Sequence, residues 1–295
     1  MKIHDSLGDR MKEYESRNQY YLQKRTPVAI RVDMRAGHTF TKGFVRPFDE
    51  VFMKSMQETA KYMCENMGNA KFAYVQSDEI TIILVDYDTL ETDCWFNYRT
   101  DKLCSISASM ATMAFNKYFA QEVDKWGAET FGYEWYEGGT NDPEVINTPE
   151  WQLAGIYSKA MKKGAMFDAR CFNIPKEEVT NLIYWRQLDA TRNSIQMIGQ
   201  ANFSHSELQG KSCNMIQDML HEQKDINWND FPTRWKRGVA CYKEIENFIK
   251  AEPSEGWAPE QKIPMTRSYW KIDYEMPILK GENRDYVDKL IYVGD

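Results

Sequence analysis

Two aspartates stand at the points where predicted strands end. Asp33 closes an apolar run at 28–33, and Asp78 lies in a tight turn between β-rich runs at 71–76 and 80–85. Carboxylates on neighbouring strand ends can hold Mg²⁺, which keeps open coordination positions for substrate phosphates. Two such ions can stabilise both the attacking and the leaving oxygen in phosphoryl transfer. From the spacing alone, two solvated acids at turn tips remain the alternative interpretation.

Basic side chains cluster close to these acids in the sequence. Guanidinium groups bind phosphates through paired hydrogen bonds, so this cluster can hold a triphosphate, although ordinary surface charge explains it equally well. His38 and Ser77 are further candidates for phosphate contacts. A second polar run lies on a predicted helix, where an exposed face is the alternative interpretation. The cluster consists of Arg31, Arg35, Lys42 and Arg46, and the second run of Arg186, Gln187, Asp189, Thr191, Arg192 and Asn193.

Hydrophobic periodicity, prolines and glycines predict the elements that position these residues. A helical stripe follows Pro47, which suits the first turn of a helix. A segment at 126–150, rich in glycine, tryptophan and acids, is expected to form an excursion or lid. The predicted strands span 28–33, 71–76, 80–85 and 165–174, and the predicted helices span 7–24, 47–67, 103–119 and 175–200.

The order strand, helix, strand, strand, helix, strand predicts an α+β fold of the ferredoxin-like, split βαβ type with an antiparallel sheet and helical additions. In this topology the first strand lies beside the central hairpin, so Asp33 and Asp78 would face each other. The segment at 221–295, with its tryptophans and prolines, is expected to wrap short helices and extended segments on the core.

Composition narrows the class of protein. The chain has 295 residues, of which 37 are Lys or Arg and 44 are Asp or Glu, giving a formal net charge of −7. Such a chain is neither disordered nor coated with nucleic acid, but a local basic cleft remains compatible with it. We expect no membrane span and no secretory signal, because charges recur throughout the chain. Six scattered cysteines without a CxxC pair favour reduced thiols in the cytoplasm and argue against structural zinc.

Four blocks of sequence resemble a known family. The first, RVDMRAGHTFTKGFVRPFD at 31–49, looks like the RxDGRxFHxF…KPxD stretch of tRNA-histidine guanylyltransferases. YVQSDEITIIL at 74–84, MFDARCFNIP at 166–175 and WRQLDATRNSI at 185–195 resemble later blocks in the same order. The resemblance implies a polymerase-type palm that works in the reverse direction and adds nucleotides to the 5′ end of tRNA. ATP first activates the 5′-monophosphate, and the 3′-hydroxyl of an incoming nucleotide, usually GTP, then attacks the activated end.

The resemblance also implies the site residues. Asp33 and Asp78 would be the carboxylates that bind two Mg²⁺ ions, with the backbone carbonyl of Met34 as a further metal ligand, and Glu79 would join the two aspartates in catalysis. Met34 and Gly37 stand where the family has glycine and an aromatic residue. The implied nucleotide-binding residues are Arg31, Arg35, His38, Arg46, Asp49, Ser77, Arg170 and Asn193.

One departure bears on the substrate. Enzymes that add the extra guanylate to histidine tRNA have HINN where this chain has Thr191-Arg192-Asn193-Ser194. The chain therefore resembles the bacterial and archaeal like-protein branch, which is associated with template-directed repair of 5′-truncated tRNAs. Strict guanylate addition, another reaction on the same palm such as nucleotide cyclisation, and a non-catalytic RNA-binding module remain alternatives. The resemblance implies a homotetramer, a palm-type catalytic region at 1–135, the rest of the catalytic domain at 136–220 and an extension at 221–295.

Overall fold

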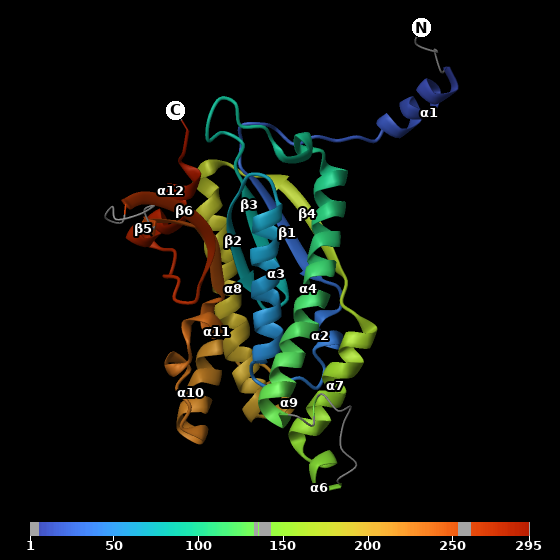
Figure 1. The fold of residues 1–295 in the computed structure, drawn as a ribbon. Coiled ribbons are helices and arrows are strands. Elements are labelled where there is room, and N and C mark those ends of the chain that lie inside the picture. Colours follow the sequence, from blue (N-terminus) through green and yellow to red (C-terminus); the bar gives the residue numbers. More distant parts are fainter. Residues whose placement is uncertain (1–5, 133–134, 136–142, 253–260, 295) are drawn as a thin grey trace.

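A six-stranded antiparallel sheet in the order β4-β1-β3-β2-β5-β6 forms the centre of the protein (Figure 1). The computed structural model describes residues 6–132, 135, 143–252 and 261–294. The order of the first four strands is that of the split βαβ topology, so the predicted fold class is confirmed. The strands are β1 (Val28–Met34), β2 (Ala70–Gln76), β3 (Glu79–Leu84), β4 (Phe167–Asn173), β5 (Val239–Glu252) and β6 (Gln261–Asp273).

Helices cover both faces of this sheet. The longest are α3 (Glu50–Asn66), α4 (Thr100–Phe131), α7 (Pro149–Lys163) and α8 (Lys176–Asn202). The shorter ones are α1 (Ser6–Ser16), α2 (Gly37–Phe40), α6 (Pro143–Ile146), α9 (His205–Leu208), α10 (Cys213–Lys224), α11 (Thr233–Arg237) and α12 (Asp285–Ile291). Within the described ranges, no helix is both long and apolar enough to cross a bilayer.

Alternation along β1 divides the side chains between two cores. Val28, Ile30 and Val32 point to the face covered by α3 and α4, where a large aromatic and aliphatic cluster is buried. Ala29 points to the other face and joins a second cluster with α8 and α12. Arg31 is the next residue of β1 on that second face. Because its side chain is charged, the apolar packing of this face ends at Arg31. The second face is therefore apolar at one end and polar at the end that carries Asp33.

The helix after Pro47 begins three residues later than predicted. α3 starts at Glu50 because Asp49 caps it, accepting a hydrogen bond from the backbone N–H of Phe52 at 2.9 Å. Pro47 lies in the preceding loop. The predicted apolar stripe is correct, and its members Val51, Phe52, Met56, Ala60 and Met63 are buried.

Three predicted segments differ from the structure. The polar helix predicted at 7–24 ends at Ser16, and α1 lies apart from the sheet and buries no side chain (Figure 1). The chain beyond it follows the backbone near Tyr98 instead, with the N–H of Leu22 donating to the carbonyl of Tyr98. The predicted excursion at 126–150 is wrong for 126–131, which continue α4, and for much of 143–150, which is helical. Its positions 133–134 and 136–142 lie outside the described residues.

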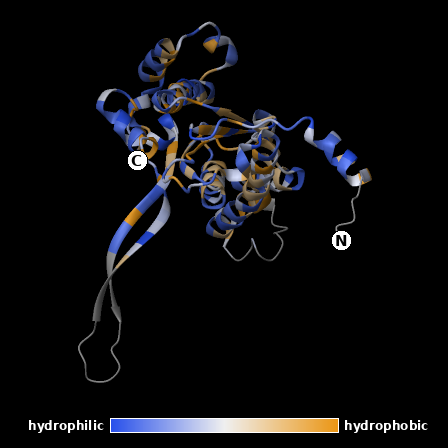
Figure 2. Ribbon diagram, turned by 90° about the horizontal axis from the view of Figure 1, so that it is seen from above, coloured by the Kyte–Doolittle hydropathy of each residue, from blue (hydrophilic) through white to orange (hydrophobic). Residues whose placement is uncertain are grey.

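The C-terminal extension adds two strands that the sequence did not predict. β5 pairs with β2 only from Phe72 to Val75, but it pairs with β6 along its whole length. The two strands therefore project from the body as a ribbon (Figure 2). Prolines and charges in this stretch hide the alternation that marks a strand. The extension also contains short helices, of which α12 joins the cluster beneath α8.

Candidate active site

Three strands and one turn bring four carboxylates to the same end of the sheet. Asp33 at the end of β1 lies opposite Glu79 of β3 and Asp168 of β4 in the antiparallel register. Asp78 lies in the β2–β3 turn. The backbone carbonyl of Asp78 accepts a hydrogen bond from the N–H of Met34 at 3.1 Å. The expected meeting of Asp33 and Asp78 is therefore present in the structure.

The charge at this point is only partly compensated. Burial raises the pKa of the Asp33 carboxyl to about 6, and repulsion from Asp78, Glu79 and Asp168 adds to the effect. In the part of the chain that the structure describes, neither Asp33 nor Asp78 makes an ion pair. Two crowded, unpaired carboxylates favour a bound cation.

The donor set fits Mg²⁺ better than zinc. No group of three or more His, Cys, Asp or Glu side chains that could enclose a metal occurs among the described residues. Zinc sites need three or four such ligands, whereas Mg²⁺ binds to one or two carboxylates and keeps waters and substrate oxygens in its remaining positions. The two aspartates therefore suit an ion whose remaining positions are filled by waters and other oxygen ligands.

Gly37 lets the loop after β1 approach this pair closely. It is the first residue of α2, and a Cβ atom built on it would lie only 1.9 Å from Oδ2 of Asp78. The preceding residue, Ala36, has a left-handed backbone with φ 55°. The wall of the site beside Asp78 is therefore backbone, and no side chain at position 37 fits without moving the carboxylate.

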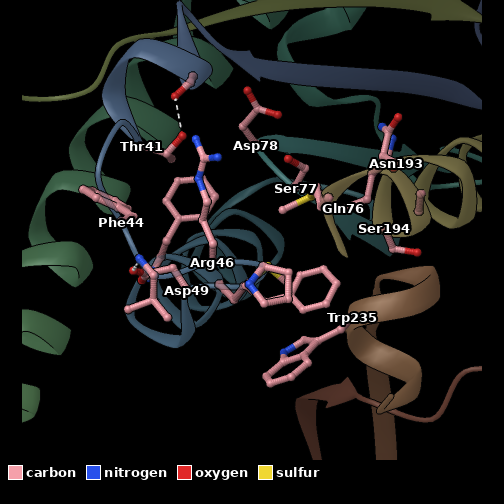
Figure 3. Close-up of a pocket in the computed structure, with 18 of the residues that line it drawn as sticks. Thr41, Phe44, Arg46, Asp49, Gln76, Ser77, Asp78, Asn193, Ser194 and Trp235 are labelled. Atoms are coloured by element: carbon pink, nitrogen blue, oxygen red, sulfur yellow. Dashed lines mark hydrogen bonds between the residues drawn. The ribbon is translucent and has the colours of Figure 1, made fainter. Parts of the chain in front are cut away.

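A cavity of about 320 Å³ opens beside Asp78 (Figure 3). Asp78 and Thr41 lie at one end of it and Trp235 at the other. Aromatic side chains and a few polar groups line it, as is typical of small-molecule sites. Five of the predicted nucleotide-binding residues line it, namely His38, Arg46, Asp49, Ser77 and Asn193.

The other predicted nucleotide-binding residues lie outside the cavity. Arg31 and Arg170 are cross-strand neighbours on β1 and β4, at the polar end of the second sheet face. The Arg170 side chain is 53% exposed, whereas that of Arg31 is only 17% exposed. Arg35 follows β1, is exposed, and donates its backbone N–H to the carbonyl of Met166. The predicted residues thus form two groups, one that lines the cavity together with Asp78 and one that lies outside it on β1, β4 and the residue after β1.

Asp49 has a positioning role in addition to lining the cavity. Its carboxylate accepts hydrogen bonds from the N–H of Val45 at 3.0 Å, the N–H of Phe52 at 2.9 Å and the hydroxyl of Tyr157 at 2.7 Å. These contacts fix the loop that carries Arg46, so Asp49 shapes the cavity through the backbone.

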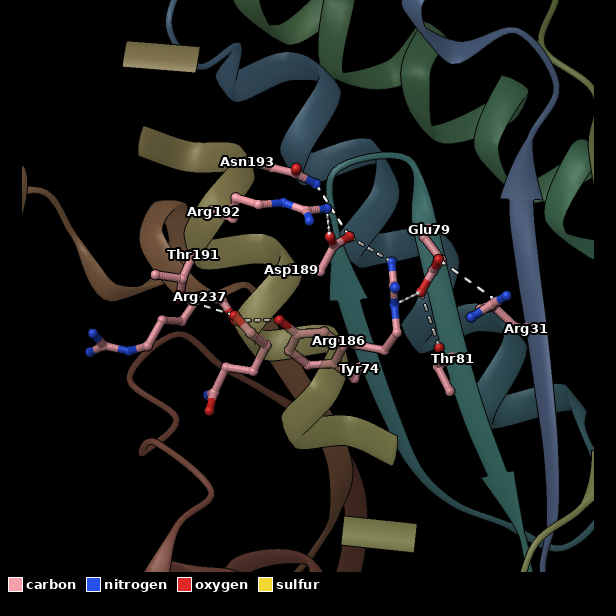
Figure 4. A network of polar contacts seen from close by, with 11 residues as sticks. Arg31, Tyr74, Glu79, Thr81, Arg186, Asp189, Thr191, Arg192, Asn193 and Arg237 are labelled. Carbon is pink, nitrogen blue, oxygen red and sulfur yellow. Dashed lines mark hydrogen bonds and ion pairs between the residues drawn. The ribbon is translucent and has the colours of Figure 1, made fainter. Parts of the chain in front are cut away.

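An ion-pair network joins the sheet to α8 (Figure 4). Arg186 is only 9% exposed; it contacts Glu79 at 2.8 Å and Asp189 at 3.0 Å. Glu79 also faces Arg31 at 3.7 Å, and Asp189 accepts a hydrogen bond from Asn193 at 3.4 Å. The network therefore holds Asn193 at the cavity and occupies both oxygens of Glu79.

Comparison with known proteins identifies the family. A family model described as tRNAHis guanylyltransferase matches residues 8–175. The chain belongs to the tRNA(His) guanylyltransferase family.

Members of this guanylyltransferase family resemble the chain in sequence and fold. A bacterial tRNA(His) guanylyltransferase (Thg1)-like protein in complex with ATP has a TM-score of 0.73 and 36% identity, covering 98% of this chain and 100% of that one. The same kind of protein in complex with GTP has a TM-score of 0.68 and 34% identity. The tRNA(His) guanylyltransferase of Saccharomyces cerevisiae is 26% identical over 233 residues, which are 74% of this chain and 83% of the yeast protein. The protein is a guanylyltransferase-like nucleotidyltransferase enzyme.

The sequence does not identify three of the residues at this candidate site. Gln76 lines the cavity, is 4% exposed, and its Oε1 has no hydrogen-bond partner among the described residues. Trp235 comes from α11, far along the chain, so no spacing signal connects it to the aspartates. The sequence indicates Arg186 only as part of a polar run. The acidic residue Glu79 directly before a predicted strand could have indicated a basic partner such as Arg186, because a buried arginine and a buried carboxylate need each other.

The Glu79–Arg186 pair gives a stability prediction. Glu79→Ala leaves the buried Arg186 guanidinium with fewer partners, so we expect the free energy of unfolding to fall by about 3 kcal/mol, as measured by urea denaturation. The double variant Glu79→Leu/Arg186→Met removes both charges and should recover much of that loss. Glu244→Ala, which breaks an exposed pair on the β5–β6 ribbon, is the matched control and should have no measurable effect. A loss for Glu79→Ala no larger than that of the control would contradict the network.

Gly37 gives a catalytic prediction. Gly37→Ala should displace the Asp78 carboxylate and lower the rate of nucleotidyl transfer by about a hundredfold, because small misplacements of reacting groups cost that much. Gly155→Ala is the control, since a Cβ there meets nothing within 4 Å and alanine favours the α7 helix. Equal turnover of the two variants would show that position 37 has room for a side chain.

Proposed function

We propose that this protein is a Mg²⁺-dependent 3′→5′ nucleotidyltransferase that repairs the 5′ end of tRNA. ATP activates the 5′-monophosphate, and nucleotides, GTP by preference, are then added under the direction of the opposite strand. The observation that carries the proposal is the placement of the unpaired carboxylates of Asp33 and Asp78 between a nucleotide-sized cavity and an open polar face. An enzyme that joins a nucleotide to a polymer end needs both spaces beside one reactive centre.

The nucleoside triphosphate is assigned to the cavity. The similar bacterial proteins were solved in complex with ATP and with GTP, which supports this ligand class. We assign its phosphates to the end with Asp78, Ser77 and Arg46, and its base to the end with Phe48 and Trp235. Arg46 neutralises phosphate charge, His38 donates a hydrogen bond to a phosphate oxygen, and Asn193, held by Asp189, contacts the nucleotide.

Asp33, Asp78 and the Met34 carbonyl are proposed to hold the metal ions. Mg²⁺ bound there supplies charge neutralisation to the phosphates that react. Glu79 acts as a positioning residue, because both its oxygens are engaged by arginines. On the open face, Arg31, Arg35 and Arg170 are proposed to bind phosphates at the 5′ end of the RNA.

The two reaction steps are phosphoryl transfers. An oxygen of the RNA 5′-monophosphate attacks the α-phosphorus of ATP, and pyrophosphate leaves. The 3′-hydroxyl of the next nucleotide then attacks the activated 5′ phosphorus, its proton passes to solvent water, and AMP leaves. In both steps, Arg46 and Arg31 position the reacting phosphates and stabilise the negative charge of the transition state.

The choice between repair and strict guanylate addition rests on α8. Thr191 and Arg192 stand where histidine-tRNA enzymes have other residues, and Arg192 is 61% exposed and paired with Asp189. This departure favours template-directed repair, and strict addition to histidine tRNA is the second candidate. We further propose a cytoplasmic homotetramer. In each chain, residues 1–135 and 136–220 form the catalytic domain, and the extension at 221–295 contributes Arg234 and Trp235 to the cavity.

The carboxylates provide a direct prediction. Asp33→Asn or Asp78→Asn should lower transfer by about a thousandfold, because the loss of a metal ligand removes several kcal/mol of transition-state stabilisation. The free energy of unfolding of Asp33→Asn should be unchanged or higher, because the folded state disfavours the charged form of Asp33. Asp88→Asn removes a carboxylate beyond the far end of β3 and should retain activity. Full activity of either site variant would remove that residue from the proposed site.

A competition assay tests the substrate. Purified protein receives Mg²⁺, ATP, labelled GTP and two 5′-monophosphorylated RNAs, a full-length histidine tRNA and a different tRNA that lacks its first nucleotide. We expect faster extension of the truncated tRNA, and changing the opposing base should change which nucleotide is added. Preference for the full-length histidine tRNA would favour the second candidate. Extension of neither RNA would contradict both.

A further inference from the structure

The open polar face beside Asp33 carries an exposed aromatic side chain. Trp185 of α8 is 53% exposed, and it is the one tryptophan among the described residues with more than a third of its surface in solvent. Most other described tryptophans pack in or against the apolar clusters, whereas Trp185 belongs to none of them. An exposed tryptophan beside a catalytic centre can stack on an aromatic group of a ligand.

Arginines surround this ring on the protein side. The guanidinium carbon of Arg186 lies 4.6 Å from the Trp185 ring centroid, and that of Arg31 lies 5.9 Å from it. Arg170 is the cross-strand neighbour of Arg31 and its side chain is 53% exposed. Arg192 lies seven residues after Trp185 on the same side of α8, and its side chain is 61% exposed. An aromatic ring with arginines around it is the composition of a single-stranded nucleic-acid platform.

The ring lies close to the reactive aspartates but outside the cavity. Arg31, which Trp185 contacts, is two residues before Asp33 on the same face of β1, a spacing of about 7 Å. Trp185 is not among the side chains that line the nucleotide cavity. A base on this ring would therefore belong to the polymer substrate and not to the incoming nucleoside triphosphate.

We propose that Trp185 is the stacking platform for the 5′-terminal base of the RNA substrate. Arg170 and Arg192 bind the neighbouring phosphates, and stacking holds the 5′-phosphate beside Asp33 and Asp78. This inference rests on the proposed function for the identity of the polymer. Stacking is tolerant of base identity because every base presents an aromatic face, which suits an enzyme that leaves the choice of base to a template strand.

Equilibrium binding tests the platform independently of catalysis. A 5′-monophosphorylated tRNA that lacks its first nucleotide, labelled at its 3′ end, is titrated with the full-length protein by fluorescence anisotropy. Trp185→Ala should weaken binding about tenfold, since stacking of one base is worth about that much. Trp185→Phe keeps an aromatic face and should restore most of the affinity. Leu188→Ala is the matched control, because Leu188 is 50% exposed one turn along α8 but has no ring.

Steady-state kinetics and oligomer mass complete the test. The Trp185→Ala variant should raise the apparent KM for tRNA and leave the KM for ATP unchanged. An equal effect of Trp185→Ala and Leu188→Ala on RNA affinity would overturn the platform. A change in sedimentation mass for Trp185→Ala alone would also overturn it, because the ring would then be covered by a second copy of the chain. If the wild-type protein binds RNA through Trp185 but transfers no nucleotide, the proposed function fails and the platform stands.

Discussion

Mutual repulsion of carboxylates at one end of the sheet is the constraint that organises this protein. The antiparallel register of β1, β3 and β4 forces Asp33, Glu79 and Asp168 together, and the β2–β3 turn adds Asp78. Glu79 is compensated by Arg186 and Arg31, and Asp168 by Arg170 at 3.5 Å. Asp33 and Asp78 have no such partner among the described residues, and burial, with repulsion from the neighbouring carboxylates, raises the pKa of Asp33 to about 6. The uncompensated charge marks the place where a cation and phosphates belong.

The surrounding elements separate the substrates at that place. The segment 37–53, which includes α2 and the start of α3, encloses the cavity together with α8 and α11 on one side of Asp78. Gly37 keeps the approach to Asp78 free of a side chain. On the other side, α8 packs over the apolar half of the second sheet face and pairs Arg186 with Glu79, which leaves Asp168 and Arg170 of β4 exposed. The buried Arg186 connects the two sides. It pairs with Glu79 in the sheet and with Asp189 on α8, and Asp189 in turn accepts a hydrogen bond from Asn193 at the cavity. One helix thus closes the nucleotide site and borders the open face.

The sequence predicted the fold class and the aspartate pair because these rest on local signals. Strand periodicity placed β1 to β4 nearly correctly, and the ferredoxin-like order brought Asp33 to Asp78. Residues that meet only through tertiary contacts were missed, as with Trp235 and Gln76. The start of α3 was misplaced because the Asp49 cap outweighs the preference for Pro47 in a first turn. The β5–β6 ribbon escaped prediction because its strands pair mainly with each other and need no regular apolar face.

The most direct test of this account is a crystal structure with Mn²⁺ and a non-hydrolysable ATP analogue. Manganese takes oxygen ligands as magnesium does, and its anomalous scattering locates the ion without assumptions about geometry. We predict the anomalous peak at Asp33 and Asp78, with the analogue's phosphates beside Ser77 and Arg46 and its base in the cavity. A peak at Glu79 or Asp189, or a nucleotide bound outside the cavity, would contradict the central claim that the unpaired aspartates are the reactive centre.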